Sequence, residues 1–215
     1  MKQQKISGEG VWLVHKPVGI SSFGVVAQVR RATGIRKVGH AGTLDPQAEG
    51  LMIILVGKEY TRQADSFLKL DKVYEVEATL GSTSATGDRE GELTHISALE
   101  PSREEVEAAL ESFTGEIMQT PPAYSAIKIG GQRAYKLARA GQEVALEARP
   151  VTIFSLDLMA YQYPRVTFRA HVSSGTYIRS LVEDIGAHLK TGAYMSALKR
   201  TRIGENDLKN AVLID

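Results

Sequence analysis

Apolar and polar positions alternate along several stretches of the chain and predict strands there. In VYEVEATL, every second residue from Tyr74 to Leu80 is apolar or aromatic, as one face of a half-buried strand requires. The run LMIILV is apolar throughout and is bounded by Gly50 and Gly57, which favours a buried strand over a helix. The stretches VTIFSLDLM and RVTFRAHV predict two further strands.

Three other stretches have the apolar spacing of amphipathic helices. SSFGVVAQVRRATG predicts a helix with Ser22 as N-cap, Gly34 at its end, and Phe23, Val26 and Val29 at helical spacing. PSREEVEAALESFTG begins with a capping box formed by Ser102 and Glu105. GTYIRSLVEDIGAHLK carries a strong apolar stripe, made by Ile178, Leu181, Val182, Ile185 and Leu189. Because helices and strands do not alternate regularly, their order predicts an α+β fold around a mixed, mostly antiparallel sheet.

The composition is that of an ordinary globular protein and excludes several kinds of chemistry. The 215 residues are 43% hydrophobic and 24% charged, and they include no cysteine, which removes disulfides, cysteine nucleophiles and thiolate metal sites. The five histidines lack zinc-ligand spacing, and no glycine loop of a phosphate or dinucleotide site is present. No apolar run is long enough for a transmembrane helix. The start MKQQKISGEG lacks the apolar core of a signal peptide, so a cytoplasmic location is expected.

Charge is unevenly distributed, although the net charge is only +1. Residues 73–116 hold eleven acidic and two basic side chains, whereas residues 117–215 hold thirteen basic and eight acidic ones. In the basic part, Arg133, Lys136 and Arg139 recur every three residues, with Tyr124 and Tyr135 nearby in the chain. A helix would carry the three cations as one stripe suited to phosphates, with aromatic rings for unstacked bases. A solvated amphipathic face explains the same pattern.

The stretch VGHAGTLDPQAEG, from Val38 to Gly50, places a lone carboxylate, Asp45, in a glycine-rich loop. An Asp-Pro pair usually marks a turn in which the carboxylate caps local backbone amides. The glycines also permit tight backbone beside the carboxylate. That arrangement suits a nucleophile, which needs an arginine partner to keep it ionised and oriented. Arg179 is a candidate partner, and an i,i+4 pair with Glu183 is the alternative for its side chain.

Six motifs, in order along nearly the whole chain, resemble those of the TruB family of pseudouridine synthases, bacterial enzymes that isomerise uridine 55 in the T-loop of tRNA. GHAGTLDPQAEGLM resembles the catalytic loop of that family and is the most specific of the six. The others are HKPVGISS, KVYEVEATLGSTSATGDREG, TPPAYSAIKIGGQRAYKLARAG, VSSGTYIRSLVEDIG and LKRTRIG. The resemblance implies the pseudouridine synthase fold, in which a mixed, mostly antiparallel sheet with flanking helices forms a catalytic cleft.

The resemblance also implies roles for individual residues. Asp45 would be the essential aspartate, Tyr74 would stack on the target base, and Arg179 would pair with Asp45. His40 would enter the T-loop where the flipped nucleotide leaves a gap. The other expected substrate-binding residues are Lys16, Pro17, Gly42, Thr43 and Leu198. The residues expected to contact the RNA backbone are Lys128, Arg133, Lys136, Arg139, Arg200 and Arg202. Turn, loop and core-packing roles remain the alternatives at these positions.

The expected domain arrangement is a single catalytic domain over residues 1–215, with an RNA-gripping insertion at about 120–150 and without the small C-terminal RNA-binding domain usual in bacterial members. The implied reaction cleaves the N1–C1′ bond of a flipped-out uridine and rejoins the base through C5, with no cofactor and no metal. Attack of Asp45 on C6, attack on C1′ and proton abstraction from the sugar all stay open. The expected partner is the T-arm of tRNA, with no membrane and no obligatory protein partner.

Three other functions fit parts of the pattern. A pseudouridine synthase acting on another RNA, within a guide-RNA assembly, would keep the chemistry and change the substrate. A tRNA chaperone would use the same cleft to open and refold the tRNA without a reaction. A generic RNA-binding module would explain the basic segment but would leave Asp45 without a role.

Overall fold

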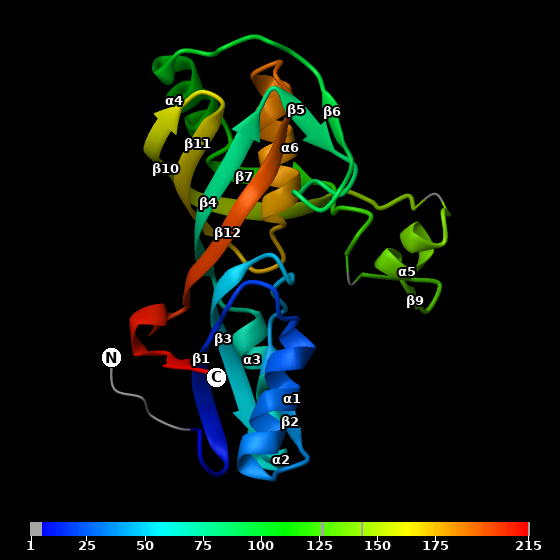
Figure 1. Cartoon of the computed structure of the whole chain (residues 1–215), viewed down its shortest axis with the longest axis vertical. Helices are drawn as coiled ribbons and strands as arrows, with labels where there is room; N and C mark the ends of the chain where they lie inside the picture. The colour runs from blue at the N-terminus through cyan, green and yellow to red at the C-terminus, as the bar shows by residue number, and fades with distance from the viewer. Residues whose placement is uncertain (1–5, 126, 143, 215) are drawn as a thin grey trace. The chain divides into compact units, whose positions relative to one another are not determined.

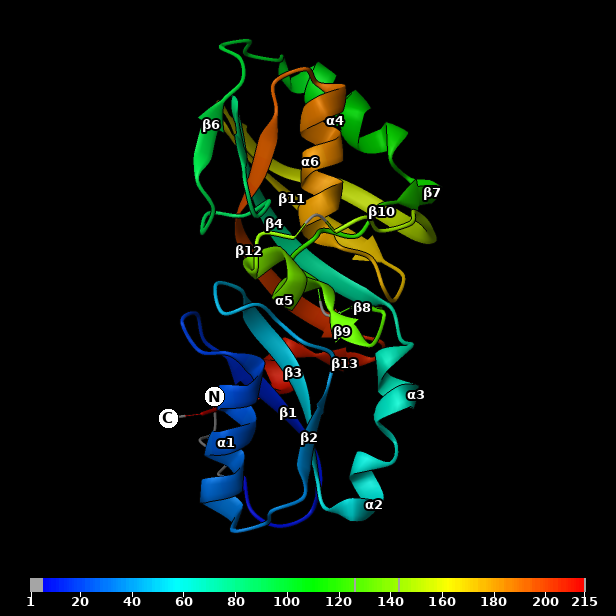
Figure 2. The same ribbon diagram turned by 90° about the vertical axis from the view of Figure 1, so that its right-hand side faces the viewer.

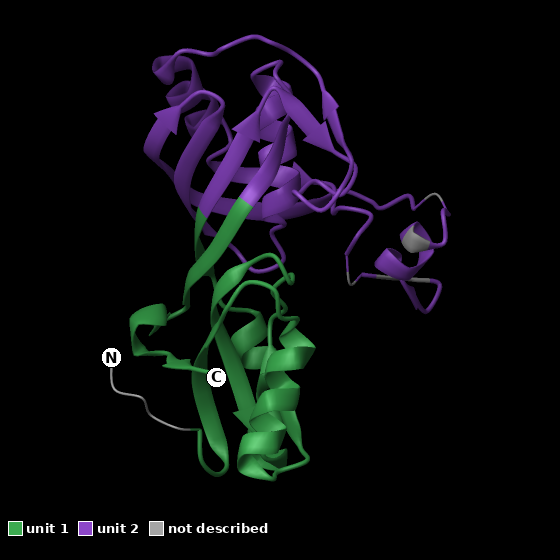
Figure 3. Cartoon of the chain, viewed as in Figure 1, with its two compact units in different colours: residues 1–75, 197–215 green, residues 76–196 purple. Residues whose placement is uncertain are grey.

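The computed structural model describes residues 6–125, 127–142 and 144–214, with the backbone alone at Lys128, Ile129 and Arg139. The chain divides into two compact units, drawn in different colours in Figure 3. Unit 1 comprises residues 1–75 and 197–215, and unit 2 comprises residues 76–196. Two strands, β4 (Lys72–Leu80) and β12 (Ala193–Ile203), have residues in both units.

Unit 1 is built on strands of mixed direction. Besides its residues of β4 and β12, it contains β1 (Gly10–Lys16), β2 (Val38–Ala41), β3 (Glu49–Val56), β13 (Asn206–Asp207) and β14 (Val212–Leu213). Strand β3 is antiparallel to β1 and β2 but parallel to β12, and β1 is parallel to β14. The helices of this unit are α1 (Ser22–Thr33), α2 (Lys58–Thr61), α3 (Ala64–Leu68) and the 3-10 helix η1 (Leu208–Asn210).

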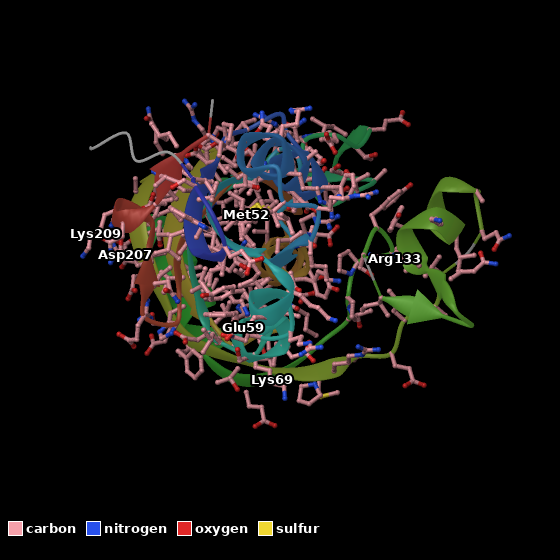
Figure 4. The ribbon with its side chains drawn as sticks, turned by 90° about the horizontal axis from the view of Figure 1, so that it is seen from below. Met52, Glu59, Lys69, Arg133, Asp207 and Lys209 are labelled. Atoms are coloured by element: carbon pink, nitrogen blue, oxygen red, sulfur yellow. The ribbon has the colours of Figure 1, made fainter. Side chains whose placement is uncertain are left out.

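Strand β3 lies at the centre of the core of unit 1. Every residue from Gly50 to Val56 is buried, which explains why the run is apolar on both faces rather than alternating. Side chains from other elements pack around it in a cluster formed by Ala41, Leu51, Ile53, Leu55, Ile203 and Ala211. Figure 4 shows Met52 of β3 among the side chains of this unit, where its accessible surface is zero. Because this strand is rigidly packed, it can fix the loop that precedes it.

Unit 2 is mainly antiparallel. Its further strands are β5 (Ser82–Ser84), β6 (Leu93–His95), β7 (Gly115–Gln119), β8 (Lys128–Ile129), β9 (Gln132–Arg133), β10 (Arg149–Gln162) and β11 (Arg165–Val172). Strand β10 pairs antiparallel with β7 and β11, β5 with β6, and β8 with β9. Its helices are α4 (Arg103–Ser112), α5 (Ala134–Arg139) and α6 (Ile178–His188). Helices α4 and α6 contact each other and lie side by side in Figure 2.

The predicted fold class, α+β on a mixed and mostly antiparallel sheet, is confirmed. All five residues of the stripe predicted on α6 are buried, and Ser102 and Glu105 form the predicted capping box of α4. One detail of α1 was predicted wrongly. The N-cap is Ser21, whose hydroxyl accepts a hydrogen bond from the Gly24 amide. Phe23, at helical spacing with Val26 and Val29, is 67% exposed, and its ring centroid lies 5.7 Å from the Arg30 guanidinium.

Candidate active site

The loop that carries Asp45 joins β2 to β3 inside unit 1. The stretch from Val38 to Gly50, predicted as an irregular loop, is irregular only from residue 42 to residue 48, because Val38–Ala41 form β2 and Glu49 begins β3. The two strands pair antiparallel, with Ala41 opposite Ile53. Both ends of the loop therefore start from paired, largely buried strands, which limits the motion of the carboxylate between them.

The helix α1 holds the loop through one buried hydroxyl. Ser22 Oγ accepts a hydrogen bond from the Leu44 amide and donates one to the Leu44 carbonyl, both at 2.8 Å. Leu44 immediately precedes Asp45, so both backbone groups next to the carboxylate-bearing residue have fixed partners. The hydroxyl can make both bonds because it is at once a donor and an acceptor. Ser22 thus orients the loop, while Ser21 caps helix α1.

Lys16, at the end of β1, lies beneath the other side of the loop and has no accessible surface. Its ammonium group donates to the Pro17 carbonyl at 2.9 Å and to the Pro46 carbonyl at 3.2 Å. The Gly19 amide donates to the same Pro46 carbonyl at 2.8 Å. The segment that follows β1 is thereby tied to the residue directly after Asp45.

Burial lowers the pKa of Lys16 to about 8, and the negative charge of Asp45 opposes this effect. Removing an ammonium group from water penalises its charged form, whereas a nearby carboxylate favours it. Burial is also the main cause that lowers the pKa of His40, with the positive charge of Arg200 as the second cause. Two buried basic side chains, Lys16 and Arg200, thus lie next to the loop.

Arg200, on β12, supplies the second buried cation under the loop. Only 2% of its surface is exposed, and its guanidinium donates to the carbonyls of Leu51, Thr43 and Gly42. This contradicts the prediction that Arg200 contacts the RNA backbone, because a side chain enclosed by protein carbonyls presents no donor to a phosphate. The expected contact rested on the place of Arg200 in LKRTRIG, a stretch that resembles a motif of the family.

Gly50 explains how β12 can pass so close to the start of β3. A β-carbon at this position would lie 2.3 Å from the Arg200 carbonyl oxygen, and the backbone φ of Gly50 is +114°. Both the contact and the conformation exclude an ordinary side chain. The parallel pairing of Gly50 with Arg200 places the guanidinium under the loop.

The side chains predicted to contact the substrate have different exposures in unit 1. Asp45, His40 and Leu198 are partly exposed, and Pro17 and Thr43 are exposed. Tyr74 lies on the apolar face of β4 with 8% of its surface exposed, as the alternation of that strand predicts. Asp45 is therefore not a buried residue, and a carboxylate on a fixed loop can act as a nucleophile or a base.

Arg179 is the second residue of helix α6 in unit 2 and is held by backbone carbonyls. Its guanidinium donates to the carbonyls of Thr86 at 3.2 Å and Tyr124 at 3.0 Å, and it lies 3.9 Å from the Asp88 carboxylate. Asp88, which sequence reasoning missed, is buried and also accepts a hydrogen bond from the Thr86 hydroxyl at 2.6 Å. Burial raises the pKa of Glu183, the predicted i,i+4 neighbour. The pairing of Arg179 with Asp45 stays a prediction.

The predicted RNA-gripping segment forms the short hairpin β8–β9 followed by α5, an excursion from the rest of unit 2 (Figure 1). Arg133, labelled in Figure 4, and Lys136 are exposed. The prediction of one helical stripe was wrong for Arg133, because this residue is the N-cap of the six-residue α5 and lies in β9. The side chains of Lys128 and Arg139 lie outside the described part of the structure.

Arg202 is partly exposed and forms an ion pair with Asp71 at 3.2 Å. Among the described residues, no three histidine or carboxylate side chains are arranged to hold a metal ion. No helix in the described ranges has the length and apolar character needed to cross a membrane.

Two family models match the chain. A model described as "TruB family pseudouridylate synthase (N terminal domain)" matches residues 30–178, and one described as "tRNA pseudouridylate synthase B C-terminal domain" matches residues 179–215. A protein of Clostridium novyi named "tRNA pseudouridine synthase B" is 45% identical over 203 residues, covering 94% of this chain and 70% of the relative. A protein of the same name from Burkholderia lata is 48% identical, covering 96% of this chain and 64% of the relative.

Solved structures resemble the chain as well. A chain in "Crystal Structure of a Cbf5-Nop10-Gar1 Complex" superposes with a TM-score of 0.74 at 28% identity, over 95% of this chain and 52% of that chain. A chain in "Structure of H/ACA RNP bound to a substrate RNA containing 2'-deoxyuridine" does so with a TM-score of 0.70 at 26% identity. The chain spans about half the length of these solved chains and roughly two thirds of the two curated relatives.

Proposed function

Because the chain belongs to the TruB family of pseudouridylate synthases, we propose that it converts uridine 55 in the T-loop of tRNA to pseudouridine. The observation that carries this proposal is the state of Asp45, whose side chain is partly exposed while the backbone on both sides is held by Ser22, Lys16 and Arg200. A turn aspartate needs no such support. A reacting carboxylate does, because small misplacements at the reacting atom greatly lower the rate.

The proposed reaction is an isomerisation confined to one nucleotide. The N1–C1′ bond breaks, the uracil rotates, a C5–C1′ bond forms, and the hydrogen on C5 leaves as a proton while N1 gains one. No atom or electron is gained or lost in total, so the proposal requires no redox cofactor. A carboxylate can assist through a covalent adduct at C6 or C1′, which divides one difficult step into easier ones, or by taking a proton from the sugar.

The target nucleotide must leave the base stack before Asp45 can reach it. Flipping a nucleotide costs a few kcal/mol, and stacking on an aromatic ring returns roughly 1–3 kcal/mol per base. We assign that ring to Tyr74, with Leu198 beside the base and His40 in the gap that the flipped nucleotide leaves. The low pKa of His40 supports this role, since a neutral imidazole enters a base stack more readily than a charged one.

Two other groups complete the proposed site. Arg179 pairs with the Asp45 carboxylate and orients it, and the ion pair with Asp88 prepares its guanidinium for that role. Lys16 ties Pro17 to the loop through its bonds to the Pro17 and Pro46 carbonyls. Gly42 and Thr43, within the loop, are proposed to contact the substrate. The proposed location is the cytoplasm, where a chain without cysteine suits the reducing conditions.

The exposed cations Arg133 and Lys136, with Arg202, are proposed to contact the phosphates of the T-arm. Lys128 and Arg139 belong to the same proposed set by their place in the sequence. Such contacts fix position and register but carry no sequence information. Selection of uridine 55 therefore depends on the shape of the loop that the pocket accepts.

The test compares wild-type protein with Asp45→Asn on a tRNA transcript that carries tritium at C5 of its uridines. The proposal expects tritium release by wild-type protein and none by the variant. It also expects tRNA affinity to stay within a few-fold, because Asn preserves the size of the side chain and removes its charge. Substantial release by Asp45→Asn would refute the role of Asp45. Loss of binding together with activity would show that this residue serves recognition.

A further inference from the structure

We propose that Arg200 is the positioning residue of the Asp45 loop, aligning the two flanks of the loop so that the carboxylate is held in its reactive direction. The inference deepens the proposed function and rests on it, since it assigns to Arg200 an effect exerted through Asp45. It replaces the RNA contact expected from the sequence, which the burial of this side chain excludes.

The geometry of the guanidinium supports this role. Arg200 Nε donates to the Leu51 carbonyl at 2.8 Å, Nη1 to the Thr43 carbonyl at 3.4 Å and Nη2 to the Gly42 carbonyl at 3.2 Å. Two of these carbonyls precede Asp45 and the third follows it. The guanidinium is planar and its N–H groups point in fixed directions. It therefore sets the distance between the residues before Asp45, Gly42 and Thr43, and Leu51 after it.

Burial makes these bonds difficult to replace. The Leu51 bond is fully buried, and water has little access to a side chain that is 2% exposed. The Leu51 carbonyl, left without its donor, would lose a hydrogen bond that solvent cannot restore. The backbone of Arg200 is itself paired with Gly50, which has no side chain to keep the strands apart. The guanidinium is thus anchored through its own strand to the strand that follows the loop.

Lys72 offers a matched control within the same unit. It too is a buried cation, and its ammonium group donates to the carbonyls of Leu68 and Leu70. Burial lowers its pKa to about 8, with the positive charge of Arg200 as the second cause. None of its hydrogen-bond partners belongs to residues 42–48. Removing Lys72 should therefore disturb stability without disturbing the Asp45 loop.

The charge of Arg200 gives a second, spectroscopic readout. Its positive charge contributes to the lowered pKa of His40. Lys16, at the end of β1, has a pKa lowered mainly by burial, and the positive charge of Arg200 lowers it further. A variant that removes the charge should raise the pKa of His40, whereas a lysine should preserve it. The amides of Leu44 and Ala48, which bond to Ser22 Oγ and the Asp45 carbonyl, report on the geometry of the loop.

The experiment compares Arg200→Met, Arg200→Lys and Lys72→Met in single-turnover and steady-state assays on unmodified tRNA. For Arg200→Met we expect kcat to fall about 100-fold, with KM changed less than about threefold, because the exposed cations that grip RNA are intact. Arg200→Lys should recover part of kcat, since an ammonium group restores the charge but cannot reproduce the planar guanidinium. Lys72→Met should keep the wild-type kcat for its folded fraction.

Nuclear magnetic resonance of the same proteins completes the test. We expect amide exchange at Leu44 and Ala48 to accelerate about tenfold in both Arg200 variants and not in Lys72→Met. The pKa of His40 should rise in Arg200→Met and stay near the wild-type value in Arg200→Lys. If Arg200→Met does not fold, the inference is tested on Arg200→Lys, by its kcat and by the exchange rates of the Leu44 and Ala48 amides.

Three results would overturn the inference. The first is a kcat of Arg200→Met within about threefold of wild type. The second is a raised KM at unchanged kcat, which would indicate an RNA contact. The third is a loss of kcat that matches the unfolded fraction alone, as in Lys72→Met. If Asp45→Asn proves inactive and one of these results holds, only this inference fails. If Asp45→Asn is active, the proposed function itself fails.

Discussion

Lys16 allows a quantitative test of the buried ammonium group next to the Asp45 loop. Its side chain has no accessible surface, and its ammonium group is satisfied by the Pro17 and Pro46 carbonyls. Its pKa is nevertheless lowered from 10.5 to about 8, with burial as the main cause. The protonated form is therefore less favourable in the folded protein than in the unfolded chain.

The sign and size of the effect follow from proton linkage. Between pH 8 and 10.5 the unfolded chain binds more protons at Lys16 than the folded protein does, so the free energy of unfolding rises with pH. A difference of about 2.5 in pKa corresponds to about 3 kcal/mol, because one pKa unit is about 1.4 kcal/mol. The destabilisation is complete below pH 8 and has disappeared above pH 10.5.

The assay is urea unfolding of wild-type protein and Lys16→Met from pH 7 to pH 11. Methionine is apolar and of similar length, and it does not titrate. The free energy of unfolding of wild-type protein minus that of the variant should rise by about 3 kcal/mol across this range. Lys72, whose pKa is also lowered to about 8, is present in both proteins, so its contribution cancels.

A difference that stays flat from pH 7 to pH 11 would refute the reasoning, because it would mean that Lys16 has the same pKa in both states. A difference that falls with pH would mean that the carboxylate of Asp45 outweighs burial and raises the pKa of Lys16. Either result would show that burial does not lower the pKa of the Lys16 ammonium group beside the loop.

Three further predictions concern other parts of the chain. Gly50→Ala should lower the free energy of unfolding by roughly 3 kcal/mol or more in urea titrations, because its β-carbon would collide with the Arg200 carbonyl and its φ is positive; a stable variant would contradict the close approach of these strands. Ser102→Ala should cost about 1 kcal/mol in thermal unfolding through loss of the capping box, and an unchanged transition would show that the cap is dispensable. The double variant Arg133→Gln/Lys136→Gln should weaken tRNA binding and reduce the salt slope of log K by about 2, whereas an unchanged slope would exclude phosphate contacts there.

Periodic features could be predicted from the sequence because burial follows local spacing. The stripe on α6 and the run in β3 bury as predicted, since each needs only its own helix or strand geometry to define a face. The capping box of α4 is equally local, because Ser102 and Glu105 satisfy each other's backbone amides within one turn. The loop around Asp45 was predicted in a different way, because its order of residues resembles that of a known family.

Features that depend on distant contacts could not be predicted. Ser21 and Ser22 are chemically equal as N-caps, and only the approach of Leu44 assigns the second hydroxyl to the loop. Arg200 has the sequence surroundings of a surface cation, and its burial depends on the missing side chain of Gly50, 150 residues earlier. Asp88 gave no signal, because its partner Arg179 comes from a helix far along the chain.

The most direct test of the account incubates the protein with unmodified tRNA transcript, without added cofactor or metal, and maps pseudouridine by carbodiimide-stop sequencing. A panel of transcripts in which single T-loop uridines are replaced by cytidine fixes the site. The account predicts one modified position, uridine 55, with wild-type protein and none with Asp45→Asn. Modification elsewhere in the panel, or no modification by a folded wild-type protein that binds the tRNA, would contradict it.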